Sequence, residues 1–218
     1  MKFLGEPRSG SFAGQTSSRN RFGQYVRNRA TPVNPNSTFQ AAVRSRLGTN
    51  ASAWRAITDV QRAGWLSLGA SISRTDSLGQ VYTLTGFQAY CEVNNNNAAV
   101  GNATVSAAPA LVAPTGLATA IVTLTAAAFS IAYTATPLPA GARLMAFASP
   151  QRSAGRSFEA DYRLISTSAA AAASPLVILT PYAARLGTPV VGQRIFISLA
   201  VYLGGFVQAP LILSQVVA

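Results

Sequence analysis

Residues 194–217 read RIFISLAVYLGGFVQAPLILSQVV. Two apolar runs, Arg194–Leu203 and Phe206–Val217, stand on either side of Gly204-Gly205. Two glycines between runs that are rich in β-branched and aromatic residues are typical of a two-residue β-hairpin. The stretch therefore predicts a pair of antiparallel strands.

Further short β-runs precede this hairpin, and turn residues such as Pro137-Leu138-Pro139-Ala140-Gly141 separate them. These runs cover residues 117–125, 128–135, 143–149, 156–167 and 175–180. Short runs in this number, without helical interludes, predict an antiparallel β-sandwich of the immunoglobulin-like or fibronectin type III-like kind over residues 117–218. Such a fold carries no function by itself.

Residues 36–101 have helical periodicity instead, with polar capping residues before each apolar run. Asn36 or Ser37 can cap a helix that ends near Ile57. Thr58-Asp59-Val60-Gln61 matches a capping box that opens a second helix, and Thr85 can cap a third. The sequence predicts a small unit of two or three helices, so that the chain as a whole is α+β.

Two other features belong to this helical unit. Trp54 and Trp65 are interpreted as core residues, and the run Asn94–Asn97 as a solvated helix end. Residues 102–116 are rich in alanine and proline and are predicted to be a linker to the β-domain.

The charge of the chain is concentrated toward its beginning. The 218 residues carry 17 basic and 6 acidic side chains, a net charge of +11. Residues 1–58 hold nine basic residues against the single carboxylate Glu6, so this quarter of the chain accounts for +8 of that charge. A basic segment on a nearly uncharged body indicates an acidic partner: nucleic acid, an anionic membrane or an acidic protein surface.

Residues 1–35 are punctuated by glycine, serine and proline and are predicted to be an extended arm, because Pro32 and Pro35 impose an extended exit. In an extended strand, alternate residues share a face. One face would then carry Arg19, Arg21, Gly23, Tyr25, Arg27 and Arg29. Several guanidinium groups on one ribbon repel one another unless an acidic surface lies against them. We expect a free arm of this composition to be disordered.

The residue types that most enzymes need are scarce. The sequence has no histidine, and Cys91 is its single cysteine, interpreted as a buried, inert thiol. Glu159 and Asp161 could form a carboxylate pair for glycoside hydrolysis or part of a calcium site, but Arg156 and Arg163 flank them and favour ion pairing. The sequence therefore predicts a protein that is not an enzyme and has no cofactor.

Two further patterns have an ordinary structural interpretation beside a functional one. Residues 117–136 are apolar enough to resemble a membrane span, but their short threonine- and β-branched runs favour two buried strands, so no membrane partner is predicted. Four tyrosines of the β-domain could form a sugar-binding platform, although core packing is the simpler interpretation: Tyr133, Tyr162, Tyr182 and Tyr202.

The first 95 residues or so resemble a motif of small tailed-bacteriophage proteins of unassigned or virion-structural role. The resemblance rests on Ser9-Gly10-Ser11, Gly14, Ser18-Arg19-Asn20-Arg21, Tyr25-Val26-Arg27, Pro32-Val33-Asn34-Pro35, Gln40, Arg44, Trp54-Arg55, Thr58-Asp59-Val60-Gln61-Arg62, Trp65, Leu84-Thr85-Gly86-Phe87 and Tyr90. The β-domain resembles the immunoglobulin-like modules common on phage particles. These resemblances imply a location in the virion, in a multi-copy assembly.

Three functions remain open from the sequence. The first is a capsid decoration (cement) or minor capsid protein that docks on the major capsid protein or other virion subunits through the basic arm. The second is a neck or tail component, and the third is a nucleic-acid-binding protein whose arm contacts phosphates. The predicted partner-binding residues are Arg19, Arg21, Tyr25, Arg27, Arg29, Arg44 and Arg46.

Overall fold

The structure is a computed structural model that describes residues 8–20, 23–34, 36–76, 78–134 and 136–218. The chain divides into two compact units, residues 1–44 and 45–218. Within the described ranges there are four α-helices, and the sheets are antiparallel. The predicted α+β class is confirmed.

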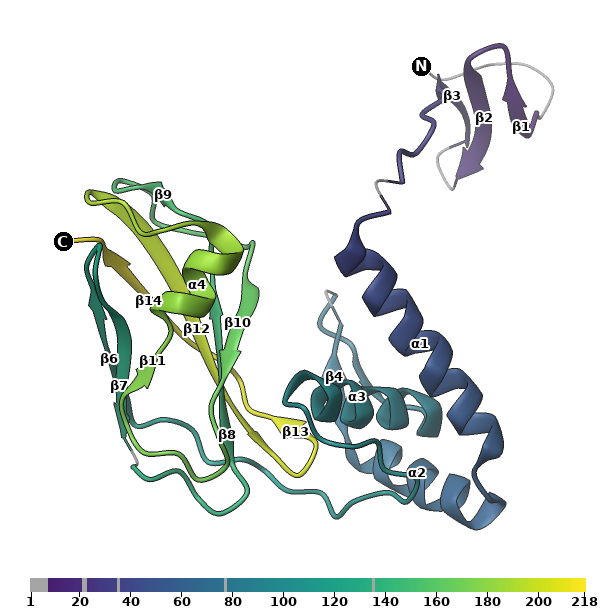
Figure 1. Cartoon of the computed structure of the whole chain (residues 1–218). Coiled ribbons are helices and arrows are strands. Elements are labelled where there is room, and N and C mark those ends of the chain that lie inside the picture. Colours follow the sequence, from purple (N-terminus) through teal and green to yellow (C-terminus); the bar gives the residue numbers. More distant parts are fainter. Residues whose placement is uncertain (1–7, 21–22, 35, 77, 135) are drawn as a thin grey trace. The chain divides into compact units, whose positions relative to one another are not determined.

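The N-terminal unit contains a three-stranded antiparallel sheet in the order β1-β2-β3 (Figure 1). Its strands are β1 (Gly10–Phe12), β2 (Gln15–Asn20) and β3 (Gly23–Asn28). Ala13 and Gly14 connect β1 to β2 with φ values of +43° and +81°, as a two-residue turn with two left-handed residues requires. The described residues of the segment 1–35 therefore do not form the extended arm predicted from the sequence, because β2 pairs antiparallel with both β1 and β3.

Helix α1 (Thr38–Ala56) begins where the sequence predicts. The Gln40 N–H donates to Ser37 Oγ at 3.3 Å, so that Ser37 caps the helix. In the second unit, the end of α1 packs through Trp54, whose ring lies 5.7 Å from the ring of Phe87 and 5.4 Å from that of Tyr90.

Helices α2 (Asp59–Ser71) and α3 (Gly86–Ala99) both begin with the predicted caps. Thr58 and Gln61 form one capping box and Thr85 and Gln88 another. Between the helices, β4 (Ser73–Thr75) and β5 (Val81–Thr83) form a short antiparallel hairpin. Apolar residues of α2 and α3, Trp65 and Tyr90 among them, form one buried cluster.

The C-terminal part of the second unit has two facing antiparallel sheets (Figure 1). One contains β6 (Thr119–Leu124), β7 (Phe129–Thr134) and β11 (Leu176–Val177); the other contains β8 (Arg143–Ala148), β9 (Arg152–Ser153), β10 (Arg163–Thr167), β12 (Gln193–Leu203), β13 (Phe206–Val207) and β14 (Leu211–Val216). Buried side chains of both sheets, such as Ile131 on β7 and Ile197 on β12, form a single core. The arrangement is compatible with a β-sandwich.

The predicted C-terminal hairpin is confirmed. Gly204 and Gly205 connect β12 to β13, which pair with Tyr202 opposite Val207 and Leu203 opposite Phe206. Strand β14 then pairs with the first half of β12, from Arg194 opposite Val216 to Leu199 opposite Leu211.

The apolar stretch 117–136, considered above as a membrane span, contains β6 and β7. No helix in the described ranges has the length and apolar character needed to cross a bilayer.

The asparagine run Asn94–Asn97 is not a solvated helix end as predicted. Asn94 and Asn97 are buried, and the Tyr202 hydroxyl of β12 donates to Asn97 Oδ1 at 2.6 Å. The Asn96 amide donates to the Gly205 carbonyl at 2.9 Å. These side chains join α3 to the second sheet, so the helices and the β-part, predicted as separate domains with a linker at 102–116, share one compact unit.

Strand β11 lies within the strand predicted at 175–180, and helix α4 (Leu179–Leu186), which the sequence does not predict, follows it and takes up the last two residues of that run. Its residue Tyr182 is fully buried, with its ring 5.2 Å from that of Phe129 and its hydroxyl donating to the Ser149 carbonyl at 3.1 Å. Burial raises the pKa of Tyr182 to about 12. Tyr133 and Tyr202 are buried as well, which confirms core packing for these three tyrosines.

Candidate functional site

The structure places the predicted partner-binding residues on three elements. Arg19 lies on β2, Tyr25 and Arg27 lie on β3, and Arg29 follows β3 directly. Arg44 and Arg46 lie on α1, Arg44 in the first unit and Arg46 in the second. Arg21 lies outside the described residues.

The predicted single basic face is wrong, because cross-strand partners share a face of a sheet. Strands β2 and β3 pair with Arg19 opposite Gln24 and Ser18 opposite Tyr25. Arg19 therefore shares its face with Gln24 and Val26, whereas Arg27 lies with Tyr25 on the other. Odd-numbered residues of β2 therefore share a face with even-numbered residues of β3, and the arginines do not all lie on one face.

Both faces of the small sheet consequently carry an arginine and an aromatic ring. Phe12 pairs with Gln15 and so lies on the face of Arg19. Tyr25 and Arg27 lie together on the opposite face, beside Thr16, which pairs with Arg27. Arg29 extends that pairing, since its N–H donates to the Gly14 carbonyl at 2.7 Å. The sheet is a two-sided basic element.

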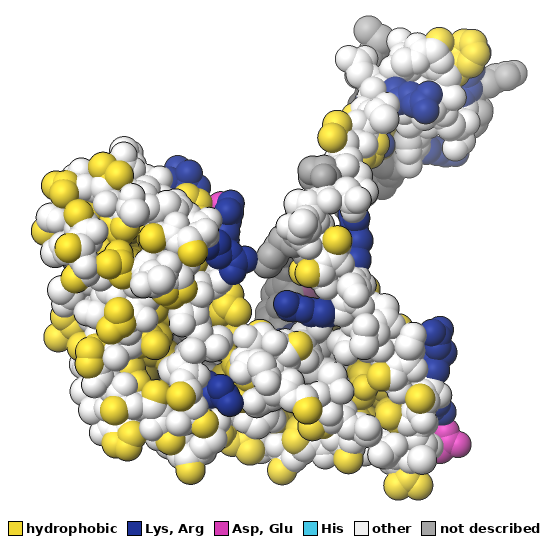
Figure 2. Space-filling model, viewed as in Figure 1, with side chains coloured by type: hydrophobic (Ala, Val, Ile, Leu, Met, Phe, Trp, Pro, Cys, Tyr) yellow, Lys and Arg dark blue, Asp and Glu magenta, His cyan; other side chains and the backbone are white. Residues whose placement is uncertain are grey.

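No side chain in the described part of residues 8–44 is buried. Phe12, Val33 and Val43 are exposed apolar residues of the same unit, with 85%, 88% and 50% of their surface accessible. Figure 2 shows basic and apolar side chains interspersed over this unit. Sequence reasoning missed these apolar residues, because their exposure depends on a fold that it did not predict.

The described part of the N-terminal unit, which begins at Arg8, contains no carboxylate that could compensate its charge. Residues 7–58 include eight arginines and no carboxylate. Arg44 has a structural role: its Nη2 donates to Asn34 Oδ1 at 3.1 Å and its Nη1 to Asn36 Oδ1 at 3.5 Å, which holds the entry to α1. Arg19, Arg27 and Arg29 remain exposed and are the residues best placed to bind an acidic surface.

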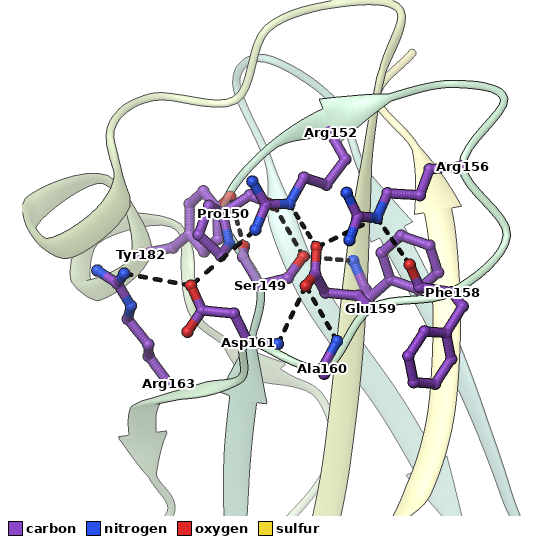
Figure 3. Close-up of polar contacts among 11 residues, drawn as sticks. Ser149, Pro150, Arg152, Arg156, Phe158, Glu159, Ala160, Asp161, Arg163 and Tyr182 are labelled. Atoms are coloured by element: carbon purple, nitrogen blue, oxygen red, sulfur yellow. Dashed lines mark hydrogen bonds and ion pairs between the residues drawn. The ribbon is translucent and has the colours of Figure 1, made fainter. Parts of the chain in front are cut away.

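The carboxylates Glu159 and Asp161 form an ion-pair network (Figure 3), as the flanking arginines predict. Glu159 Oε2 accepts from Arg152 Nε and lies 3.5 Å from Arg156 Nε. Its Oε1 accepts from the N–H groups of Ala160 and Asp161, both at 3.0 Å. The hydrogen bond from Arg152 is the main cause that lowers the pKa of Glu159 to about 2. Both oxygens are therefore engaged, and Glu159 is not poised to donate a proton.

The single cysteine, Cys91, is not in an environment that favours nucleophilic chemistry. Cys91 is half-buried, and burial raises the pKa of its thiol, which disfavours the reactive thiolate. The thiol predicted as buried is thus partly exposed. Among the described residues, no three metal-binding side chains gather in one place.

Comparison of the chain with protein-family models, with curated proteins and with solved structures gave no match.

The Glu159 network makes stability sensitive to acid. A carboxylate whose pKa falls from 4.5 to about 2 on folding stabilises the folded protein fully above pH 4.5 and loses that contribution as the pH falls to 2. We expect Glu159→Gln to lower the free energy of unfolding at pH 7, and the difference from wild type to shrink between pH 4.5 and 2. Urea unfolding of both proteins at several pH values measures this. A difference independent of pH would contradict the assignment.

Proposed function

We propose that this protein is a non-enzymatic structural protein of a tailed-phage virion, a capsid decoration or minor capsid protein. It docks on major capsid protein subunits through its N-terminal unit. The observation that carries the proposal is a sheet with arginines on both faces, no carboxylate and no buried side chain in its described part. The sequence resemblance to phage virion proteins supports the same assignment.

The described part of the small sheet has no apolar core of its own. Three strands need an apolar face or a packing partner to be stable in water. The β1-β2-β3 sheet buries no described side chain, so contact with another protein surface would supply the stabilisation. Strands β1 and β3 each pair on one side only within the described residues, which leaves edges where strands of a coat protein can add.

The positive charge of the β1-β2-β3 sheet indicates that its partner has an acidic surface. Arginine presents a planar fork that matches carboxylates, and each semi-exposed pair contributes about 0.2–1 kcal/mol. Because the two faces of the sheet both carry arginine, the element suits a position between two acidic neighbours. Repetition over a symmetric shell multiplies such weak contacts. A position in the neck or tail would use the same surface in fewer copies.

We extend the proposal to the fold of the β-part. We assign the two facing sheets to an immunoglobulin-like or fibronectin type III-like module, in keeping with the run of short antiparallel strands and the shared core. Modules of this kind add a compact body to an assembly without requiring an active site.

A second candidate function rests on Tyr25 and Arg27, which share a face of the sheet. An aromatic ring beside a cation is the combination by which single-stranded nucleic acids are bound, through stacking and phosphate contacts. The absence of carboxylates from residues 7–58 suits phosphates as well as acidic proteins.

The test is incorporation into phage particles. We expect deletion of residues 1–31 to abolish incorporation. Changing Arg19, Arg27 and Arg29 together to glutamine should weaken attachment by about 0.6–3 kcal/mol, about 3- to 150-fold. Quantitative mass spectrometry of purified particles measures the copy number, which also separates a shell protein from a neck or tail protein.

Arg62→Gln is the matched control, because it removes a charge from the exposed Arg62–Asp59 pair of the second unit. If the variant that lacks residues 1–31 is present in particles at the wild-type copy number, docking through the N-terminal unit is refuted.

Titration with single-stranded DNA at ~50 mM salt tests the second function. Binding that weakens steeply as the salt concentration rises, together with normal incorporation of the glutamine variant, favours nucleic acid.

A further inference from the structure

The loop of residues 154–162, between β9 and β10, lies over part of the outer face of the second sheet. Phe196 on β12 pairs with Ser214 on β14, and both side chains belong to that face. Phe158 and Tyr162 of the loop, with Ile212 of β14, surround a cavity of about 160 Å³ above Phe196. In other proteins an apolar cavity of about this size admits a benzene ring.

Polar contacts of the buried Glu159 side chain and of two arginines stabilise this loop. Glu159 is 4% exposed, and its carboxylate accepts hydrogen bonds from Arg152 and from two backbone N–H groups of the loop itself. The Arg156 side chain crosses the loop, with its Nε donating to the Phe158 carbonyl at 2.7 Å. Figure 3 shows Arg152 and Arg156 converging on Glu159, with Phe158 beside them. The aromatic ring and the guanidinium groups are therefore presented together.

The rim of the cavity is apolar and exposed. Phe158 is 72% exposed and Ile212 is 59% exposed. Exposed apolar side chains that line one cavity, on a loop stabilised by hydrogen bonds, are a feature of binding surfaces. Such an anchor contributes most when it is covered by a partner.

The charge around the rim indicates what that partner carries. Arg152, Arg156 and Arg163 pair with Glu159 and Asp161, so three arginines stand against two carboxylates. Arg194 adds a further positive charge beside them, since it donates to the Ala154 carbonyl of the loop and to Ser214 Oγ of β14. The two terminal nitrogens of Arg156 donate no hydrogen bond within the described part of the chain, and its side chain is 45% exposed. Arg156 can therefore bind an incoming carboxylate.

We propose that the 154–162 loop and β14 form a second docking site, for a protein segment in which an apolar side chain is next to a carboxylate. The apolar side chain enters the cavity between Phe158 and Ile212, and the carboxylate pairs with Arg156. This site lies wholly on the β-part, and it does not depend on the function proposed for the N-terminal unit.

The test uses the full chain and a synthetic acetylated and amidated peptide, Gly-Ser-Leu-Asp-Glu-Ser-Gly, followed by amide chemical shifts in NMR. We expect a dissociation constant of about 1 mM or below, with the largest shifts at the 154–162 loop and β14. Two control peptides replace leucine by serine, or both acidic residues by their amides, and each should bind at least about fivefold more weakly.

Phe158→Ala should weaken binding of the first peptide about fivefold or more without changing the melting temperature, because the ring is mostly exposed. Ile121→Ala is the matched control, since Ile121 is 68% exposed on β6 of the other sheet, and it should bind as wild type does.

Four outcomes would overturn the proposal. They are no shifts at millimolar peptide, equal binding of the amide control, equal loss in both alanine variants, and shifts at the loop that depend on protein concentration without peptide. The last would show that a second copy of this chain occupies the site.

Discussion

Replacing Trp65 by alanine is expected to lower the free energy of unfolding by about 3–5 kcal/mol. Trp65 is fully buried, and its ring packs edge-on against Tyr90 with centroids 5.1 Å apart. Its Nε1 also donates to the Ser106 carbonyl at 2.8 Å. The substitution removes the largest side chain of this cluster and leaves that carbonyl without its indole donor, and both effects destabilise the folded state.

Equilibrium unfolding in urea, followed by circular dichroism, measures the effect. Val60→Ala on the same helix is the control, because Val60 is 83% exposed and its truncation should change stability by less than about 0.5 kcal/mol. Equal losses in the two variants would mean that α2 does not pack through Trp65.

The elements that could be predicted from the sequence are those fixed by neighbouring residues. The capping box at Thr58–Gln61 and the cap at Thr85 depend on side chains within three positions of the start of each helix. The Gly204-Gly205 turn likewise depends on two consecutive residues and the runs beside them. Local chemistry decided these elements, and the structure agrees with it.

The missed elements depend on contacts between distant residues. Helix α4 starts within an apolar run, Ile178-Leu179, that looks like a strand, and it is stabilised by burying Tyr182 against Phe129. Asn94 and Asn97 are polar but buried, because loop carbonyls and the Tyr202 hydroxyl satisfy their amides. Nothing in the local sequence indicates these partners.

The candidate site was predicted in composition but not in geometry. The cluster of arginines is visible in the sequence, yet the face each side chain occupies depends on the pairing of β2 with β3. The N-terminal segment has few large apolar residues, so no apolar pattern in the sequence indicates that its strands pair with one another. A polar sheet with a weak apolar pattern is consistent with an element that is completed by a partner.

The last prediction compares two glycines of α2. A Cβ at Gly69 would lie 2.6 Å from the Leu84 carbonyl oxygen and 3.0 Å from that of Thr85. These are backbone atoms, and the Leu84 N–H donates to the Gly69 carbonyl at 3.2 Å, so the segment cannot move away without losing this contact. We expect Gly69→Ala to destabilise the protein by about 1–3 kcal/mol, although alanine favours a helix.

Gly64→Ala on the same helix should have the opposite sign. Its Cβ would meet only the Ala108 Cβ, at 3.7 Å, which is an ordinary contact. The higher helix propensity of alanine then stabilises the protein by up to about 1 kcal/mol. Urea unfolding of the two variants measures the pair, and stabilisation by both would show that the 84–85 segment does not lie against Gly69. Because that segment leads into the Thr85 cap of α3, the sign at Gly69 reports directly on the α2–α3 contact that supports the second unit.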